Sequence, residues 1–443
     1  MPHVSFVPFT GLRVREQRLL ELGMSLPGLT ERGAAIAELP ALGLLTLAGM
    51  LPEEWTGSYH PASNSSEELA AAIIAERPTL VAISALTASI NEAYAFADRL
   101  RLAGVVVVMG GLHVTACPDE ARRHATAVVV GEGEPVWREV LRDAESGELK
   151  PHYLASLYRA NSRDPAEWPM PRYDLLGSLP PRFTLQAERG CPLACEFCGA
   201  SRLLGRFREK PTANIREELA AIARLSPRPM IELADDNTFV GRRPPEELFG
   251  ALADVGARYF TEADWRIGTR PEVLQGLAAS GCVQVLVGIE SQVFRYPGMG
   301  AKDREWHEML AAVEAIQASG VVANGCFIVG ADGETPASID RLVEFLLASP
   351  FAEIQLTLQT PFPGTTLYER LRAAGRLLPD LDWSHYTLFD VTYHPDAMTV
   401  EELEQGFTRA LSALFAAEPA ARRSALRKQI WSRSPVFSSR KTK

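Results

Sequence analysis

The sequence predicts an α/β protein: a doubly wound parallel sheet, then a partial barrel of six strand–helix units, then a helical C-terminal extension. Two observations support this prediction. Short runs rich in Val and Ile alternate with helical patterns, and parallel strands joined by helices show this alternation. The alternation stops in a proline-rich stretch at residues 146–180 and then starts again, which indicates two α/β units in the 443 residues.

Composition and charge limit the class of protein. Hydrophobic residues make up 47% of the chain and charged residues 23%, as is typical of soluble globular proteins. No apolar run approaches the roughly 18 residues that a membrane helix needs, and the first residues lack the layout of a secretory signal. We therefore expect a cytoplasmic protein without a membrane span. The net charge of −10 disfavours nucleic acid as a partner.

The C-terminal end carries the opposite charge. Between Ala421 and Lys443 eight residues are Lys or Arg and none is acidic. We expect a solvated and partly disordered tail, since runs of like charge repel one another. A contact with an acidic partner or a phosphate surface is the alternative.

Residues 1–145 form the predicted doubly wound sheet, with strands at 3–9, 79–84, 105–109 and 127–130 and helices at 39–51, 91–103, 118–124 and 135–143. Ligands of such sheets bind beyond the carboxyl ends of the strands. Three loops meet this condition, at residues 84–89, 110–115 and 131–134. Their glycines permit close approach of a ligand to the backbone. The hydroxyls of Ser84, Thr87 and Ser89 can bond phosphate or amide groups.

A linker at residues 146–180 separates this sheet from the barrel, because prolines at 151, 165, 169, 171, 180 and 181 interrupt any long element. The barrel is expected at residues 181–375, with strands at 183–188, 230–234, 263–267, 283–289, 321–329 and 353–359, each followed by a helix. Six units predict a partial TIM-type barrel with its polar groups at the carboxyl ends of the strands. Residues 376–443 form the extension, which either walls off a substrate or packs under the barrel.

Three of the six cysteines lie in one loop after the first barrel strand. Cys191, Cys195 and Cys198 have the spacing C-x3-C-x2-C. Thiolates at this spacing suit zinc or an iron–sulfur cluster, and a redox or structural thiol cluster is a further alternative. Zinc would need a distant fourth ligand, whereas a four-iron cluster with three cysteines leaves one iron open for a ligand. Of the other cysteines, Cys282 and Cys326 lie in apolar runs and are expected to be small core residues, and Cys117 is expected to be a buried or half-exposed thiol.

This loop, within residues 183–206, resembles the signature of the radical S-adenosylmethionine (SAM) enzymes. The resemblance implies a 4Fe–4S cluster on Cys191, Cys195 and Cys198 whose open iron chelates SAM. Residues 327–334 (FIVGADGE) and 288–291 (GIES) resemble the family segments beside the adenine and the ribose of SAM. The frequent G-G-E after the second strand is replaced by A-D-D-N at 234–237. The expected SAM contacts are Phe197, Asp235, Glu290, Ser291, Gly330 and Glu334.

The first unit resembles the Rossmann-like cobalamin-binding domain that precedes many radical SAM enzymes. The resemblance lies in residues 105–115 (VVVVMGGLHVT), 118–121 (PDEA) and 130–134 (VGEGE), and residues 361–368 (PFPGTTLY) resemble the cobalamin-containing branch. The cobalt-ligating D-x-H-x-x-G motif is not found, which implies a lower axial face free of a protein His. An empty domain is the alternative. The expected cobalamin contacts are Ser84, Thr87, Gly110, Gly111, His113, Gly131 and Gly133.

Together the resemblances imply an enzyme that uses a 5′-deoxyadenosyl radical, most simply for cobalamin-dependent methylation of an unactivated carbon in a small-molecule or natural-product substrate. They also imply an external electron donor of the flavodoxin or ferredoxin type. The alternatives are a cobalamin-dependent oxidation, cyclisation or rearrangement, as in tetrapyrrole cyclases, and a non-catalytic cluster- or cobalamin-binding sensor. A methylthio-transferase acting on RNA is disfavoured, since the N-terminal cysteine cluster of that class is absent and the chain is acidic. The sequence identifies neither the substrate nor a catalytic residue.

Overall fold

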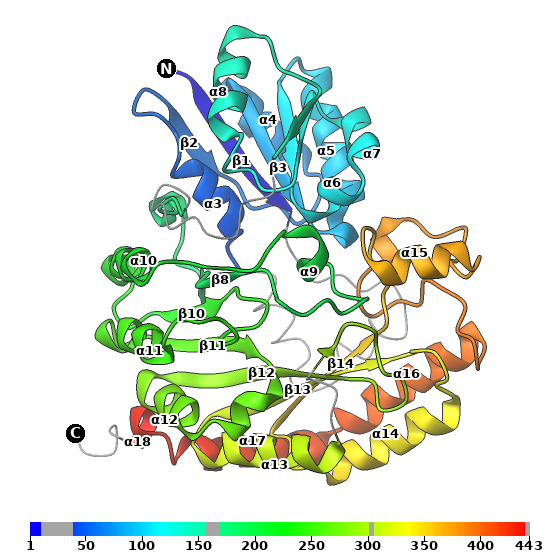
Figure 1. The fold of residues 1–443 in the computed structure, drawn as a ribbon. Helices are drawn as coiled ribbons and strands as arrows, with labels where there is room; N and C mark the ends of the chain where they lie inside the picture. The colour runs from blue at the N-terminus through cyan, green and yellow to red at the C-terminus, as the bar shows by residue number, and fades with distance from the viewer. Residues whose placement is uncertain (10–38, 156–167, 301–304, 439–443) are drawn as a thin grey trace.

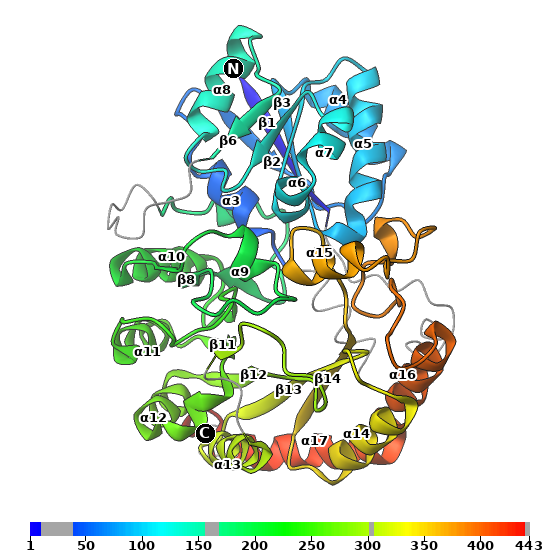
Figure 2. The same ribbon diagram turned by 45° about the vertical axis from the view of Figure 1, so that its right-hand side comes forward.

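The computed structural model describes residues 1–9, 39–155, 168–300 and 305–438. Two α/β units lie one above the other, with α9 (Ala200–Leu203) and α15 (Thr366–Ala373) between them (Figures 1 and 2). This arrangement confirms the predicted fold class. Among the described residues, no helix is both long and apolar enough to cross a membrane.

The N-terminal unit is a parallel sheet of six strands in the described part of the chain, in the order β2-β1-β3-β4-β5-β6. The strands are β1 (His3–Phe9), β2 (Thr56–Tyr59), β3 (Leu80–Ala85), β4 (Val107–Gly110), β5 (Ala127–Val130) and β6 (His152–Leu154). Separate hydrophobic clusters cover its two faces, as in a doubly wound sheet. The helices are α3 (Leu42–Ala48), α4 (Glu67–Glu76), α5 (Ile90–Leu102), α6 (Leu112–Ala116), α7 (Pro118–His124) and α8 (Trp137–Ser146).

The second unit is also a parallel sheet of six described strands, in the order β14-β13-β12-β11-β10-β7. Its edge strands β7 and β14 are not paired with each other, so the barrel is open. The strands are β7 (Phe183–Leu185), β10 (Met230–Leu233), β11 (Arg258–Ala263), β12 (Cys282–Glu290), β13 (Val322–Val329) and β14 (Glu353–Leu358). The helices are α10 (Thr212–Leu225), α11 (Pro245–Asp254), α12 (Pro271–Ser280), α13 (Trp306–Ala318), α14 (Pro336–Ala348) and α16 (Val400–Leu414), besides α15. The short strands β8 (Glu188–Arg189) and β9 (Arg208–Glu209) pair antiparallel beside the cysteine loop.

The third barrel strand lies earlier in the chain than predicted. The prediction of a strand at 263–267 is wrong: β11 ends at Ala263, and Trp265–Thr269 is the 3₁₀ helix η4. On one face of β11 Tyr259 and Thr261 are buried, whereas Glu262 on the other face is exposed. The charged inner face explains the error, because a search for continuous apolar runs does not find a strand with charged residues on alternate positions.

The prediction of a disordered basic tail is also wrong for the described residues. The helices α17 (Ala417–Trp431) and α18 (Pro435–Ser438) pack under the barrel, while residues 439–443 lie outside the described part. The Arg427 guanidinium lies 2.8 Å from the Glu353 carboxylate. The Trp431 indole donates a 2.8 Å hydrogen bond to the Val283 carbonyl. Because Glu353 and Val283 lie at the start of their strands, α17 covers the amino-terminal end of the barrel.

Candidate functional site

Two cavities lie at the carboxyl ends of the two sheets. The first, of about 280 Å³, is between the units and is lined by the glycine loops of the N-terminal sheet and by Gln186 and Arg189 of the barrel. The second, of about 260 Å³, lies in the barrel mouth and is lined by the cysteine loop and the ends of the barrel strands. The cavities are therefore adjacent along the chain, since Arg189 lines the first and Cys191 the second.

The first cavity contains five of the seven predicted cobalamin contacts: Ser84, Gly110, Gly111, Gly131 and Gly133. Gly111 has a φ of +104°, and a Cβ there would lie 2.7 Å from the Ser84 hydroxyl oxygen. A side chain is thus excluded, and bare backbone forms this wall. None of the described residues that line the cavity is a His. A cavity with broad glycine walls fits a large flat cofactor whose metal takes no protein ligand.

Thr87 and His113, the other two, lie outside the lining of that cavity. The His113 ring is buried, and its Nδ1 lies 3.2 Å from the Thr87 hydroxyl. Its Nε2 lies 3.6 Å from the Glu120 carboxylate, which accepts a 2.9 Å hydrogen bond from the Trp383 indole. His113 and Trp383 also meet edge to face, with ring centroids 5.0 Å apart. These contacts attach η6 (Trp383–His385) of the C-terminal extension to the N-terminal unit.

Buried ion pairs join the two units beside the first cavity. The Arg189 guanidinium lies 2.8 Å from a Glu134 carboxylate oxygen and 3.4 Å from Glu132. Arg208 also pairs with Glu132, and all four side chains are at most 14% exposed. Burial alone would raise the pKa of Glu134, but the Arg189 charge holds it below the usual value. The V-G-E-G-E loop is therefore bound to the chain segment that leads into the cysteines.

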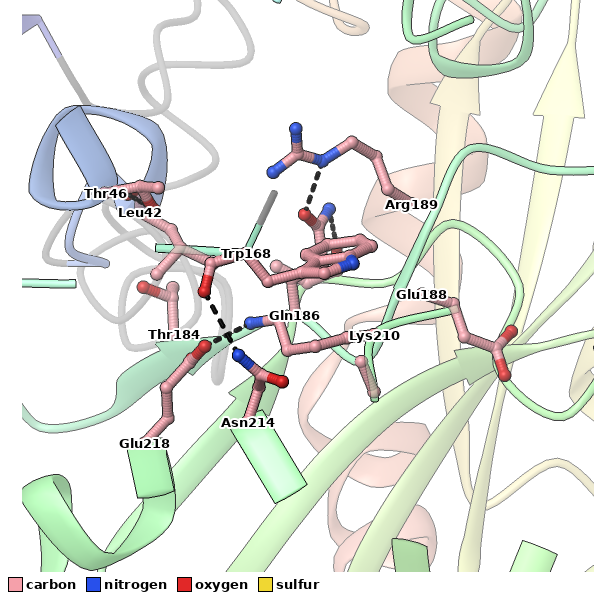
Figure 3. A network of polar contacts seen from close by, with 12 residues as sticks. Leu42, Thr46, Trp168, Thr184, Gln186, Glu188, Arg189, Lys210, Asn214 and Glu218 are labelled. Carbon is pink, nitrogen blue, oxygen red and sulfur yellow. Dashed lines mark hydrogen bonds and ion pairs between the residues drawn. The ribbon is translucent and has the colours of Figure 1, made fainter. Parts of the chain in front are cut away.

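Figure 3 shows how Arg189 is held from the barrel side. Its Nε donates a 2.9 Å hydrogen bond to the Gln186 side chain, and its guanidinium carbon lies 5.2 Å from the centroid of the Trp168 ring. The Lys210 ammonium lies 5.4 Å from the same centroid and pairs with Glu218 (Figure 3). Cation–π and ion-pair contacts together fix the side chains around the cysteine loop.

Cys191, Cys195 and Cys198 all line the second cavity. The Asn237 amide nitrogen lies 3.7 Å from Cys191 Sγ, and Cys195 Sγ lies 4.0 Å from the Gly298 carbonyl oxygen. Among the described residues, no group of three or more His, Cys, Asp or Glu side chains is placed to bind a single metal ion. A cluster does not need such convergence, because each thiolate binds a different iron. Three thiols on one loop at the wall of a cavity fit a cluster with one open iron.

The predicted SAM contacts divide between the cavity wall and the layer behind it. Phe197 and Glu290 line the cavity, and the Phe197 ring packs edge to face on Tyr296 at 4.7 Å. Asp235, Ser291, Gly330 and Glu334 are not among its lining residues. Ser291 donates to the Glu334 carboxylate, which also accepts the Gly330 N–H at 2.8 Å.

The pair Asp235-Asp236 holds the segment that enters the cysteine loop. One Asp235 oxygen accepts the backbone N–H groups of Ala187 and Glu188 at 2.7 and 2.9 Å, so its role is structural. Asp236 accepts the Gly190 N–H at 3.0 Å and lines the cavity. The sequence analysis predicted Asp235 as a SAM contact. Asp236 also follows the end of β10, so its position in the sequence indicated a site residue equally well.

Further lining residues were missed or misread from the sequence. Cys326 was expected in the core, but it is half-buried and lines the second cavity, whereas Cys282 is buried as predicted. Alternate residues of β13 face the lumen of the barrel, so the position of Cys326 in the strand could have predicted that it lines the cavity. Missed polar residues of the lining are Asp236, Asn237, Glu262, Asp264, Gln355, Thr357, Gln359 and Thr360.

Comparison with known proteins agrees with this geometry. Residues 34–141 match the B12 binding domain family, and residues 187–346 match the radical SAM superfamily. The chain is 27% identical over 341 residues to bacteriochlorophyllide d C-12(1)-methyltransferase of Chlorobaculum tepidum, covering 74% of this chain and 73% of that protein. The solved structure of the cobalamin-dependent radical SAM enzyme OxsB with aqua-cobalamin superposes with a TM-score of 0.71 at 14% identity, covering 97% of this chain and 72% of OxsB. The methyltransferase TsrM of Kitasatospora setae, with cobalamin and a 4Fe–4S cluster, gives 0.65 at 16% identity, covering 94% and 90%.

The fold and its two cavities define a cofactor-dependent α/β enzyme in which a sheet-edge site faces a barrel mouth. The chain belongs to the radical SAM enzymes that carry an N-terminal B12-binding domain. The predicted cofactors of this family are therefore confirmed: a 4Fe–4S cluster, SAM and cobalamin. Because the chain is an enzyme, the alternative of a non-catalytic sensor is not retained.

The ion pairs between the units predict the effect of Glu134→Gln. The substitution leaves the buried Arg189 with only the more distant Glu132, so we expect the free energy of unfolding to fall by about 3 kcal/mol, measured by urea denaturation. Glu139→Gln is the matched control, because Glu139 pairs with the exposed Lys150 in the same unit and its loss should change little. Equal effects of the two substitutions would contradict a stabilising role for the buried pair.

Glu188 predicts a pH dependence of stability. Its side chain is buried, one carboxylate oxygen has no hydrogen-bond partner, and burial with the nearby Asp235 raises its pKa from 4.5 to about 8. The folded state therefore binds this proton more tightly than the unfolded state, and stability falls as pH rises from about 4.5 to 8, by at most about 1.4 kcal/mol per pH unit. Glu188→Gln removes this contribution. Urea midpoints from pH 5 to pH 9 should show a flatter profile for the variant than for the wild type, and parallel profiles would contradict the assignment.

Proposed function

We propose that this chain catalyses cobalamin-dependent methylation of a carbon atom in a small-molecule substrate. The observation that carries the proposal is the adjacency of the two cavities, since Arg189 lines the first and Cys191, two residues further along the same loop, lines the second. One cofactor site would supply the radical initiator and the other the methyl group. Both sites must therefore open on the same substrate. The methyltransferase activity of the bacteriochlorophyllide relative supports the same reaction class.

When bound, the cluster and SAM supply the radical initiator and cobalamin supplies the methyl group. In this proposal Cys191, Cys195 and Cys198 hold the cluster, and the Asn237 amide donates toward the Cys191 sulfur. Such a hydrogen bond stabilises the negative charge on sulfur and favours the reduced state. Phe197 and Glu290 on the cavity wall would orient SAM.

Behind the cysteines, an ion-pair network fixes the position of the loop. The buried Glu196 carboxylate accepts hydrogen bonds from the Arg370 guanidinium at 2.9 and 3.2 Å. Arg370 also donates to Asp332 after β13 at 2.6 Å, and the Glu196 carbonyl accepts the Leu367 N–H at 2.9 Å. The start of α15 and the fifth strand end are thus bonded to the residue between the second and third cysteines. This rigid support keeps a reactive centre in one geometry.

On the other side, Gly110, Gly111, Gly131 and Gly133 would receive cobalamin, with Ser84 beside them. Their bare backbone permits contact over a wide surface. The described lining of this cavity contains no His. The C-terminal extension contributes Leu388 to the second cavity and so narrows its access to water.

We also propose an electron donor, a cellular location and the limits of the domains. An external low-potential electron donor would reduce the cluster. The six cysteines all lie in the described part of the chain and none forms a disulfide, as suits the proposed cytoplasmic location. The domain limits are proposed at 1–145, 146–180, 181–375 and 376–443, of which residues 156–167 of the linker lie outside the described part.

Product analysis tests the reaction type. The protein is reconstituted anaerobically with iron, sulfide and cobalamin, reduced, and given SAM with a deuterated methyl group. We expect both S-adenosylhomocysteine and 5′-deoxyadenosine, measured by mass spectrometry, because a methylase of this kind uses SAM in two ways. Formation of 5′-deoxyadenosine without S-adenosylhomocysteine would instead favour oxidation or cyclisation.

The assignment of the cluster ligands is tested separately. Cys191→Ala, Cys195→Ala and Cys198→Ala should each abolish the iron–sulfur absorbance and SAM cleavage, because three thiolates are needed to hold the cluster. Cys282→Ala is the matched control, since Cys282 is buried away from both cavities and should leave both signals intact. An intact and active cluster in Cys195→Ala would refute the assignment.

A further inference from the structure

The lining of the second cavity is acidic. Four carboxylate residues face it, and among its described lining residues there is no Lys, Arg or His. The four are Asp236, Glu262, Asp264 and Glu290. Such a wall repels anions and attracts a cation or a strong hydrogen-bond donor.

Three of these carboxylates have partners within the protein: Asp236, Asp264 and Glu290. Asp264 pairs with the Arg266 guanidinium at 2.6 Å, and Asp236 accepts the Gly190 N–H. Within the described part of the chain, the Glu262 carboxylate accepts no hydrogen bond and forms no ion pair, although it lines the cavity. An unused carboxylate on the wall of a cavity is free to meet a ligand.

Asn324 provides a second, independent observation. It lies two residues before Cys326 on β13, and since Cys326 lines the cavity, strand alternation directs Asn324 toward the lumen too. Its side chain is only 2% exposed, and its Oδ1 has no hydrogen-bond partner. The strand register places Glu262 beside Leu286 and Leu286 beside Asn324, so the two unpaired acceptors occupy one level of the barrel. A buried acceptor without a donor, such as Asn324 Oδ1, is rare, and a ligand that brings N–H groups would satisfy it and also pair with the Glu262 carboxylate.

This level lies below the expected SAM contacts. Glu290 is four residues further along β12 than Leu286, the register partner of Glu262. The separation along the strand is therefore roughly 13 Å. A group bound at Glu262 would occupy the lumen beneath SAM rather than the SAM position itself.

The arginines closest in the strand register are already occupied. Arg182 bonds Glu232 at 2.9 Å and stacks on Phe260, two residues before Glu262. Arg427 of α17 bonds Glu353, the register partner of Asn324. The protein itself thus supplies no free guanidinium to Glu262 from these positions.

We propose that the substrate carries an ammonium or similar cationic N–H group, and that Glu262 and Asn324 bind this group in the barrel lumen as specificity-determining residues. The inference rests on the proposed function, because it assigns the substrate class of the same site. A neutral lipid would leave the buried Asn324 Oδ1 without a donor and the Glu262 carboxylate without a counter-charge.

Proton binding at Glu262 agrees with this role. The Glu262 side chain is open to the cavity but enclosed by the barrel, and the resulting desolvation, with the neighbouring acidic groups Glu232, Asp236, Asp235 and Glu290, raises its pKa from 4.5 to about 7. A bound cation favours the ionised carboxylate, so cation binding should strengthen as pH rises from 6 to 8. In the free enzyme, the negative charge of Glu262 is unfavourable beside the other acidic groups. A positively charged ligand offsets this repulsion, so the site favours a cation.

The test uses three probes of similar size: n-pentylammonium, 1-pentanol and pentanoate. Binding to the reconstituted holoenzyme with SAM present is measured anaerobically by titration calorimetry. We expect n-pentylammonium to bind about tenfold more tightly than 1-pentanol, as for a hydrogen-bonded charge. Glu262→Gln should remove this preference, and Glu314→Gln, a change at an exposed position on α13, should keep it.

The outcomes separate this inference from the proposed function. Cleavage of SAM without substrate is measured for the wild type. The iron–sulfur absorbance of Glu262→Gln should match that of the wild type, which shows that the variant is folded and holds the cluster. Tighter binding of 1-pentanol or pentanoate, or an unchanged preference in Glu262→Gln, would overturn the inference while SAM cleavage still supports the enzyme class. A loss of SAM cleavage with a raised KM for SAM in Glu262→Gln would also overturn it, because Glu262 would then serve SAM.

Discussion

The rest of the structure depends on the neutralisation of two buried arginines across the boundary between the units. Arg189 and Arg208 belong to the barrel, and the carboxylates that accept their charge, Glu132 and Glu134, belong to the glycine-loop sheet. Neither unit can bury these groups alone at low cost. The same residues line or flank the first cavity, and the cysteine loop begins two residues after Arg189. Docking of the units and placement of both cofactor sites are therefore one event.

The two cavities differ in how they recognise a ligand. The first presents glycine backbone, which suits a large rigid cofactor whose shape does the recognition. The second presents thiols and acidic side chains, which suit a metal cluster and small charged groups. The segment that Asp235 and Asp236 hold through backbone N–H groups runs from the first cavity to the second. A reaction that uses two cofactors needs two sites with different linings, because each cofactor must bind in its own site and not in the other.

Local patterns in the sequence predicted the sheets, the cysteine loop and the glycine walls, because these follow from short-range periodicity and spacing. The predictions that were wrong concerned features that depend on tertiary contacts. The strand ending at Ala263 has a charged inner face, the helix of Arg427 is ordered by acceptors from distant strands, and Cys326 faces a lumen rather than a core. Four short or edge elements were also missed: β2, β6, α4 and α6. His113 was predicted to contact cobalamin, yet it lies outside the first cavity and packs against Trp383, a residue far along the chain.

The contact of Trp383 with Glu120 and His113 has a consequence for synthesis. The two partners of the indole hydrogen bond are 263 residues apart in the chain. At about 5–20 residues per second, the ribosome needs roughly 13 to 50 s to make the intervening segment. During that time Trp383 does not cover the edge of the N-terminal sheet at His113. In the first part of that time Arg189 is also missing, so Glu132 and Glu134 lack their partner. The nascent unit therefore exposes buried polar groups until translation is almost complete, which makes this edge a natural contact for a chaperone.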